Sequence, residues 1–153
     1  MNVYRLASGQ YTHDLSGTGA KLYGGRWNMP GLPALYTAQH ISLAVLEILV
    51  HLQAYRKPVD YHLVTIAIPD NAATFVLDPL QLKKQWKDDV GYTQLIGNDF
   101  LNTQASLVLK VPSAIIEQEH NIIINPVHPA ADQVTIQLIQ HFIFDKRLYL
   151  TNE

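Results

Sequence analysis

Strand-like and helix-like segments are unevenly distributed along the chain, and this distribution is the strongest constraint on its fold. Runs rich in β-branched and aromatic residues occur toward both ends, whereas the helix-like segments lie in the middle. We expect strands at 3–6, 34–37, 61–68, 74–77, 106–111, 114–117, 121–124 and 134–138, helices at 43–52, 78–86 and 92–102, and a glycine-containing loop at 8–20. This order favours a mainly antiparallel α+β fold over a doubly wound parallel sheet.

The length and composition predict one domain. The chain has 153 residues, 48% of them hydrophobic, which is enough for one core of ordinary size. Neither an internal repeat nor a low-complexity linker divides it, so we expect a compact single domain over residues 1–153. The absence of cysteine excludes disulfides, thiolate metal ligands and a cysteine nucleophile. The histidines lack the spacing of metal ligands, and we expect neither a metal nor a bound cofactor.

The charge and hydropathy patterns exclude two classes of partner. With a formal net charge of -2 and 16% charged residues, the chain lacks the basic excess that binds phosphate backbones, so we expect no direct nucleic-acid binding. Its first residues do not form a basic segment followed by an apolar run, and no apolar run reaches about 18 residues. The expected protein is cytoplasmic, with no membrane contact.

Glu47 is the only charged residue in the helix-like run 43–52, which follows the N-cap residue type Ser42 and is otherwise almost wholly apolar. Such a composition predicts a buried helix. Burying a carboxylate costs several kcal/mol unless it finds a partner. Glu47 is therefore either a structural residue, paired with an arginine such as Arg5 or facing water at a rim, or a functional one. The helix alone does not separate these interpretations.

The segment Gly24-Gly25-Arg26-Trp27-Asn28 presents an arginine after two glycines. Glycine lets the backbone turn tightly or approach a ligand closely. The planar guanidinium can bind two phosphate oxygens at once, which suits a pyrophosphate. The segment matches neither the three-glycine dinucleotide fingerprint nor a phosphate loop. The alternative is a glycine turn followed by a surface arginine and a core tryptophan.

Three further residues are candidates for a binding site. Tyr36, just before the buried helix, could offer its ring to a flat heterocycle, although an isolated tyrosine is more often part of a core. Arg5 is a second arginine in a mainly apolar setting. Ser113, at a strand junction, could bond a ribose oxygen or make an ordinary turn hydrogen bond. The polar residues Asn121, Asn125 and His128 could simply satisfy loop backbone.

These residues belong to an ordered set of motifs that resembles the RES domain family, which is named for an arginine, a glutamate and a serine. The resemblance runs from Tyr4 to Leu148. The motifs are, in order, Tyr4-Arg5-Leu6, Leu15-Ser16-Gly17, Gly24-Gly25-Arg26-Trp27-Asn28, Leu35-Tyr36-Thr37, Leu46-Glu47, Val111-Pro112-Ser113, Asn125-Pro126-Val127-His128-Pro129 and Phe144-Asp145-Lys146-Arg147-Leu148. Each motif is weak alone, whereas the ordered set is specific.

The resemblance implies a fold like that of ADP-ribosyltransferases and a role as the toxin of a type II toxin–antitoxin pair, with an Xre-type helix-turn-helix antitoxin as partner. NAD⁺ is then the substrate. Its nicotinamide–ribose bond would be cleaved by hydrolysis or phosphorolysis, which depletes NAD⁺ and arrests growth. Alternatively, ADP-ribose would be transferred to a protein. The family's functional positions correspond to catalytic Glu47, Arg26, Tyr36 and Ser113, with Arg5, Arg26, Tyr36 and Ser113 binding NAD⁺.

These residue types suit that chemistry. Nicotinamide leaves as a neutral ring, and the transition state resembles the oxocarbenium ion of glycoside cleavage. One carboxylate, Glu47, could stabilise the positive charge. Arg26 and Arg5 would hold the pyrophosphate, while Tyr36 would pack on nicotinamide or ribose and Ser113 would position a hydroxyl. Two rival functions are a non-catalytic binding module and a ribonuclease, the latter disfavoured by the near-neutral charge.

Overall fold

A computed structural model describes residues 1–52 and 58–149 of the chain. Its centre is a seven-stranded sheet in the order β4-β5-β6-β2-β1-β3-β7. Every neighbouring pair is antiparallel except β4 and β5. The strands are β1 Asn2–Ser8, β2 Leu35–Ala38, β3 Tyr61–Ala67, β4 Thr74–Val76, β5 Val108–Pro112, β6 His120–Ile124 and β7 Thr135–His141. The expected mainly antiparallel α+β fold is confirmed.

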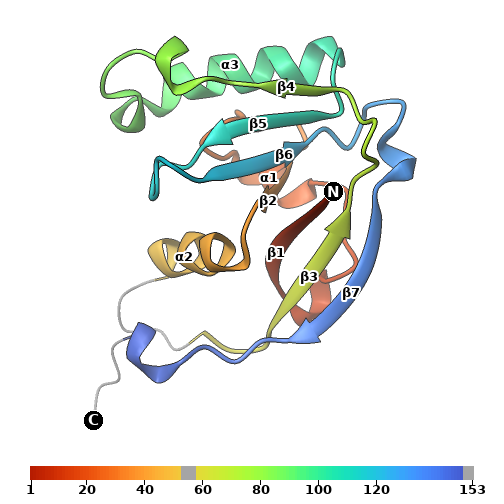
Figure 1. The fold of residues 1–153 in the computed structure, drawn as a ribbon, viewed down its shortest axis with the longest axis vertical. Helices are drawn as coiled ribbons and strands as arrows, with labels where there is room; N and C mark the ends of the chain where they lie inside the picture. The colour runs from red at the N-terminus through yellow and green to blue at the C-terminus, as the bar shows by residue number, and fades with distance from the viewer. Residues whose placement is uncertain (53–57, 150–153) are drawn as a thin grey trace.

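The sheet is nearly divided between β1 and β2. These strands are paired at one register position only, Tyr4 with Ala38, whereas β1 pairs with β3 along its whole length, from Asn2 with Ala67 to Ser8 with Tyr61. Figure 1 shows β5, β6 and β2 as one group and β1, β3 and β7 as another, at a different inclination. Helix α2, Ile41–His51, lies beside the junction and contacts both β1 and β2.

Two apolar layers cover opposite faces of the sheet. On one face, helix α3, Val90–Thr103, packs Phe100 and Leu101 into a cluster that contains Ile123 of β6. On the other face, Ile122 and Ile124 join a cluster with residues of β1 and β3. Alternate residues of a strand point to opposite faces, so three successive isoleucines serve both layers. Burial of β6 on both faces fixes the position of this strand inside the molecule.

Helix α2 begins two residues earlier than expected and is buried on one face only. Its N-cap is His40 rather than Ser42. Leu43 and Val45 enter the core, but Val50 is 58% exposed. The expectation of a wholly buried helix is therefore wrong, because the face of α2 that carries Val50 is turned away from the core. None of the helices in the described ranges is long and apolar enough to cross a bilayer.

The expected α-helix at 78–86 and the expected strand at 114–117 do not form. The segment 78–86 forms short 3-10 helices at Pro79–Gln81 and Trp86–Asp88 instead of one α-helix. Asp78 does form the expected N-cap, but Gln85 has a φ of 60°, a left-handed conformation that interrupts a helix. The expected strand at 114–117 is a turn after β5. The expected loop at 8–20 contains a 3-10 helix, Gly9–Tyr11, and the start of helix α1, Thr18–Tyr23.

In the loop after β6, the polar side chains form hydrogen bonds with backbone groups, which is one of the roles that the sequence suggested for them. The Asn125 side chain donates to the Leu101 carbonyl and accepts from the Val127 N–H. His128 Nδ1 accepts from the Ala130 N–H. Both the nitrogen and the oxygen of the Asn125 amide are thus hydrogen-bonded within the fold. Asn121, at the other end of β6, has a different role, described below.

Candidate active site

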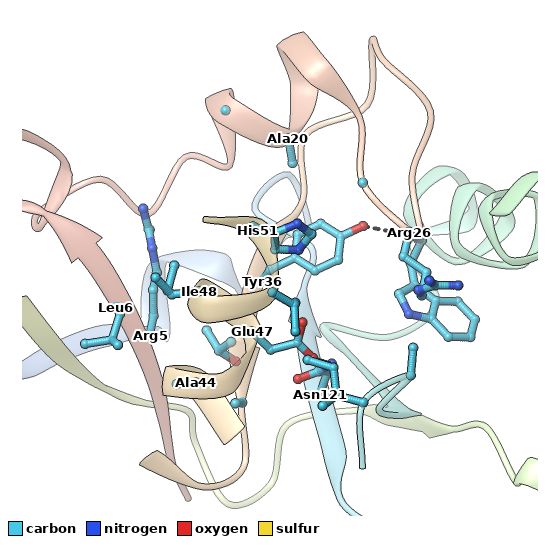
Figure 2. Close-up of a pocket in the computed structure, with 18 of the residues that line it drawn as sticks. Arg5, Leu6, Ala20, Arg26, Tyr36, Ala44, Glu47, Ile48, His51 and Asn121 are labelled. Carbon is cyan, nitrogen blue, oxygen red and sulfur yellow. Dashed lines mark hydrogen bonds between the residues drawn. The ribbon is translucent and has the colours of Figure 1, made fainter. Parts of the chain in front are cut away.

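A cavity of about 920 Å³ opens where the sheet divides. This volume lies in the range of pockets that bind small molecules and cofactors. Arg5, Arg26, Tyr36 and Glu47 all line it. The structure thus brings four of the five predicted site residues to one cavity, and they come from β1, the turn after α1, β2 and α2. Figure 2 shows Arg5 and Arg26 on opposite sides, with Glu47 and Tyr36 between them.

The Gly24–Asn28 segment places Arg26 on a rigid turn. The Gly25 N–H donates to the Asn28 carbonyl at 2.9 Å, which closes the turn. Gly24 has a φ of 72°, a conformation that favours glycine. A Cβ on Gly25 would lie 2.6 Å from the Tyr36 hydroxyl oxygen, so the second glycine is required for close approach. Both glycines are therefore structural requirements of the turn, as expected for a site that brings backbone and side chains close together.

Helix α3 supports the same turn from outside the cavity. The Thr93 hydroxyl donates to the Arg26 carbonyl at 2.6 Å. The Gln94 amide donates to the Gly25 carbonyl at 2.9 Å. Arg26 itself donates from Nη1 to the Lys87 carbonyl at 2.8 Å, and its guanidinium lies 5.9 Å from the centre of the Trp86 ring. One edge of the guanidinium is thereby fixed by protein. Its other N–H groups make no hydrogen bond to the residues that the structure describes, which leaves them for a ligand.

Tyr36 is fixed by its hydroxyl while its ring lines the cavity. The hydroxyl donates to Asn28 Oδ1 at 2.7 Å and accepts from the Trp27 N–H at 2.9 Å. Burial raises the pKa of Tyr36 well above its usual range, against smaller opposing contributions from the Trp27 hydrogen bond and the Arg26 charge. Tyr36 therefore remains a neutral hydrogen-bond donor at physiological pH. Its role in the core and its place on the cavity wall are compatible.

The Glu47 carboxylate is held by neutral donors. Asn121 Nδ2 donates to Glu47 Oε1 at 2.6 Å, and the Ser113 hydroxyl lies 3.4 Å from the same oxygen. No arginine or lysine in the described ranges forms an ion pair with Glu47. Of the two structural interpretations, the ion pair between Glu47 and an arginine such as Arg5 is therefore wrong. A carboxylate held without a cation keeps its negative charge available to a ligand.

Ser113 lies behind Glu47 rather than on the cavity wall. Its side chain is fully buried, with 0% of the residue exposed. Its oxygen accepts from the N–H groups of Ile115 and Ile116, at 3.0 and 3.2 Å. A hydroxyl has two acceptor sites and one proton, so only the proton remains, and it is directed to Glu47. The bonds from the Ile115 and Ile116 N–H groups are the turn hydrogen bonds that were the alternative interpretation of Ser113. The buried hydroxyl does not line the cavity, which differs from the expected direct contact with a ribose.

Arg5 lines the opposite side of the cavity. Its Nη1 donates to the Asp14 carbonyl at 2.6 Å. Burial lowers the pKa of the Arg5 guanidinium, while the nearby Asp14 carboxylate raises it. Arginine stays protonated in proteins, so Arg5 brings a positive charge to the cavity. Arg5 and Arg26 together give two cationic sides to a space whose third charge is Glu47.

Sequence reasoning missed two asparagines that shape the site. Asn28 is visible in the sequence only as the end of a motif; in the structure its amide nitrogen donates to three backbone carbonyls, those of Ala20, Met29 and Leu32. The role considered for Asn121 was to satisfy loop backbone, but this residue lies in β6 and lines the cavity. One available signal was its position in a strand of isoleucines, since asparagine is depleted in strands.

Comparisons with known proteins agree with the motif resemblance. A model of the RES domain matches residues 2–147. A protein named Toxin Res from Photorhabdus laumondii subsp. laumondii is 44% identical over 130 residues, which cover 83% of each chain. A protein named Prs ADP-ribosylating toxin from a Sphingobium species is 36% identical over 154 residues, which cover 96% of each chain. The relatives share this chain's length as well as its sequence.

A solved structure has the same fold. A chain in the crystal structure of the M. tuberculosis MbcT–MbcA toxin–antitoxin complex superposes with a TM-score of 0.76 and 24% sequence identity. The match covers 92% of this chain and 83% of that one. Because the family model spans almost the whole sequence and relatives named as toxins match it at 36% and 44% identity, this chain belongs to the RES domain family, as a relative of its toxins.

Proposed function

We propose that this protein is the toxin of a type II toxin–antitoxin pair and that it cleaves the nicotinamide–ribose bond of NAD⁺. The observation that carries the proposal is the Glu47 carboxylate, which within the described part of the chain is held by neutral donors only, on the wall of a cavity that Arg5 and Arg26 also line. Two cations suit a pyrophosphate, and an unpaired carboxylate suits a developing positive charge. NAD⁺ combines both features in one molecule.

The reaction needs few catalytic groups. As the C–N bond breaks, its electron pair goes to the nicotinamide ring, which leaves neutral and needs no general acid. The ribose becomes oxocarbenium-like, as in glycoside cleavage. Glu47 stabilises that charge, and Tyr36 packs beside the nicotinamide or ribose. Arg26, with Arg5, binds the pyrophosphate. Ser113 acts through Glu47, since its hydroxyl does not line the cavity.

The fate of the ADP-ribosyl group decides the biological effect. Attack by water or by phosphate depletes NAD⁺ and arrests growth, and this is the function that we propose. Transfer to a protein is the second candidate, because the Sphingobium relative at 36% identity is named as an ADP-ribosylating toxin. Both outcomes begin with the same bond cleavage at the same site. They differ only in the nucleophile.

An antitoxin is the proposed partner. The structural neighbour was solved as a toxin–antitoxin complex, and the family resemblance implies an Xre-type helix-turn-helix protein. NAD⁺ enters as the substrate and not as a resident cofactor.

The test is a time course of NAD⁺ and its products with purified protein free of antitoxin, with and without phosphate. The wild-type protein is expected to release nicotinamide, and Glu47→Gln is expected to lose the activity while keeping its circular dichroism spectrum. ADP-ribose as product indicates hydrolysis, and ADP-ribose 1″-phosphate indicates phosphorolysis. Label from adenine-labelled NAD⁺ retained on a protein band indicates transfer. Intact NAD⁺ in all conditions would refute the proposed function.

A further inference from the structure

Asn121 and Glu47 meet from two elements that are far apart in sequence. Asn121 Nδ2 lies 2.6 Å from Glu47 Oε1, and the two residues are 74 positions apart. Figure 2 shows their side chains side by side below Tyr36. It is the shorter of the two hydrogen bonds that the described residues make to the Glu47 carboxylate. Asn121 is therefore the principal protein contact of the carboxylate on which the proposed chemistry depends.

The backbone of Asn121 is fixed on both sides. It pairs with Ala38 of β2 and with Val111 of β5, so β6 is an interior strand at this point. The next residue, Ile122, is almost fully buried. A side chain that starts from such a strand has its Cα position set by two neighbouring strands. Its amide can therefore hold the carboxylate of α2 in one place, which a side chain on a free loop would not do.

The chemistry of the two groups sets the orientation of the amide. An ionised carboxylate only accepts hydrogen bonds, so Asn121 must present its NH₂ group and not its oxygen. Asn121 and Ser113 both contact Oε1. Within residues 1–52 and 58–149, no side chain or backbone group donates to Oε2. Because Glu47 lines the cavity, Oε2 is the oxygen that remains for a substrate.

We propose that Asn121 is a positioning residue: it fixes Oε1 of Glu47 through a neutral amide, so that Oε2 faces the reacting ribose. The proposal rests on the proposed cleavage of NAD⁺. A lysine or arginine at this position would also hold Oε1, but its charge would oppose the stabilisation of an oxocarbenium ion. A neutral amide orients the carboxylate and leaves its field available to the substrate.

The role predicts a particular kinetic signature for Asn121→Ala. The value of kcat is expected to fall at least about tenfold, with KM for NAD⁺ changed by less than about threefold, because the amide acts on the transition state through Glu47. The acid limb of the pH profile of kcat/KM is expected to move to higher pH, since the carboxylate loses a hydrogen-bond donor that favours its charged form. Asn121→Asp is expected to move it further, because two carboxylates at this separation do not both ionise easily.

A second measurement does not depend on activity. The chain contains only four glutamates, Glu47, Glu117, Glu119 and Glu153, so selective ¹³C labelling of glutamate side-chain carboxyls gives a simple NMR titration. The Glu47 signal is assigned by its loss in Glu47→Gln. Its titration midpoint is expected to rise in Asn121→Ala. The matched control is Asn102→Ala, an exposed asparagine of α3 that does not line the cavity, which is expected to leave both the midpoint and the pH profile unchanged.

The outcomes separate the two proposals. If the wild-type protein leaves NAD⁺ intact, the proposed function fails, and the role of Asn121 in it fails as well. If the wild-type protein cleaves NAD⁺ but Asn121→Ala keeps the wild-type kcat, pH profile and titration midpoint, only the role of Asn121 is overturned. A loss of activity with an unmoved titration midpoint and pH profile would mean a merely structural role, and would also overturn it.

Discussion

The hydroxyl of Tyr36 donates a hydrogen bond of 2.7 Å to the side-chain oxygen of Asn28. This bond ties β2 to the turn that carries Arg26, and Asn28 is itself completely buried. Because the same hydroxyl also accepts from the Trp27 N–H, Tyr36 holds the turn at two points. The Tyr36 hydroxyl is therefore one of the contacts that set the geometry of the arginine side of the cavity.

Tyr36→Phe removes this oxygen and leaves two buried polar groups, the Trp27 N–H and Asn28 Oδ1, without that partner. We expect the free energy of unfolding to fall by about 1–3 kcal/mol, the usual result of such a loss. Urea denaturation with constant m-value measures it. The control, Tyr11→Phe, changes a tyrosine that is 52% exposed and is expected to lie within about 0.5 kcal/mol of wild type. An equally stable Tyr36→Phe protein would contradict the role of the hydroxyl.

Arg26→Lys keeps the positive charge but loses the planar guanidinium and its paired N–H donors. A lysine does not bond the Lys87 carbonyl and two phosphate oxygens together, as the fixed guanidinium can. We expect KM for NAD⁺ to rise about tenfold or more, with a melting temperature close to that of wild type. Arg147→Lys is the matched control, because Arg147 pairs with Asp145 at the surface. Equal KM values in wild type and Arg26→Lys would show that the site does not use the paired N–H donors.

Two glycines of α3 provide a test of packing. A Cβ on Gly97 would lie 1.7 Å from the Trp27 carbonyl oxygen, a backbone atom that cannot turn away, whereas a Cβ on Gly91 would have only an ordinary contact of 3.5 Å with Asp89. Gly97→Ala is expected to lower the free energy of unfolding by about 3 kcal/mol or more. Gly91→Ala is expected to leave the free energy of unfolding unchanged or to raise it by up to about 1 kcal/mol. Thermal unfolding of both variants decides; similar melting temperatures would refute the close packing of α3 on the turn.

The contact between Asp14, whose carbonyl binds Arg5, and Ser16 predicts a pH dependence of the free energy of unfolding. The Ser16 hydroxyl holds the pKa of Asp14 below its ordinary value of 3.8, with smaller contributions from the Ser16 N–H and from Arg5. A carboxyl with a lowered pKa in the folded state stabilises it above the ordinary pKa, and this contribution is lost as pH falls through the folded value. Ser16→Ala is therefore expected to be less stable than wild type at pH 7, with the difference shrinking at a pH well below 3.8.

Denaturation at both pH values measures this difference. A gap between wild type and Ser16→Ala that stays constant as Asp14 is protonated would mean that the contact contributes nothing through the charge of Asp14.

Local sequence patterns determined most of the secondary structure of this protein. Strand alternation, helix length and the capping residue Asp78 are properties of neighbouring residues, and all but one of the expected strands and two of the three expected helices formed near the expected positions. The same patterns failed at 78–86 and 114–117. In the first, Gln85 adopts a left-handed conformation; in the second, the buried Ser113 hydroxyl bonds the N–H groups of a turn. Neither event is visible in residue types alone.

The ordered set of motifs also predicted which side chains gather at the cavity, since Arg26, Tyr36 and Glu47 all line it. Tertiary structure decided how they work. The single register position between β1 and β2 opens the cavity. Long-range packing places Asn121 against Glu47 and puts Ser113 behind it. Hydrogen bonds between residues 74 positions apart depend on how the sheet and α2 pack, and a linear sequence carries no distance information at that range.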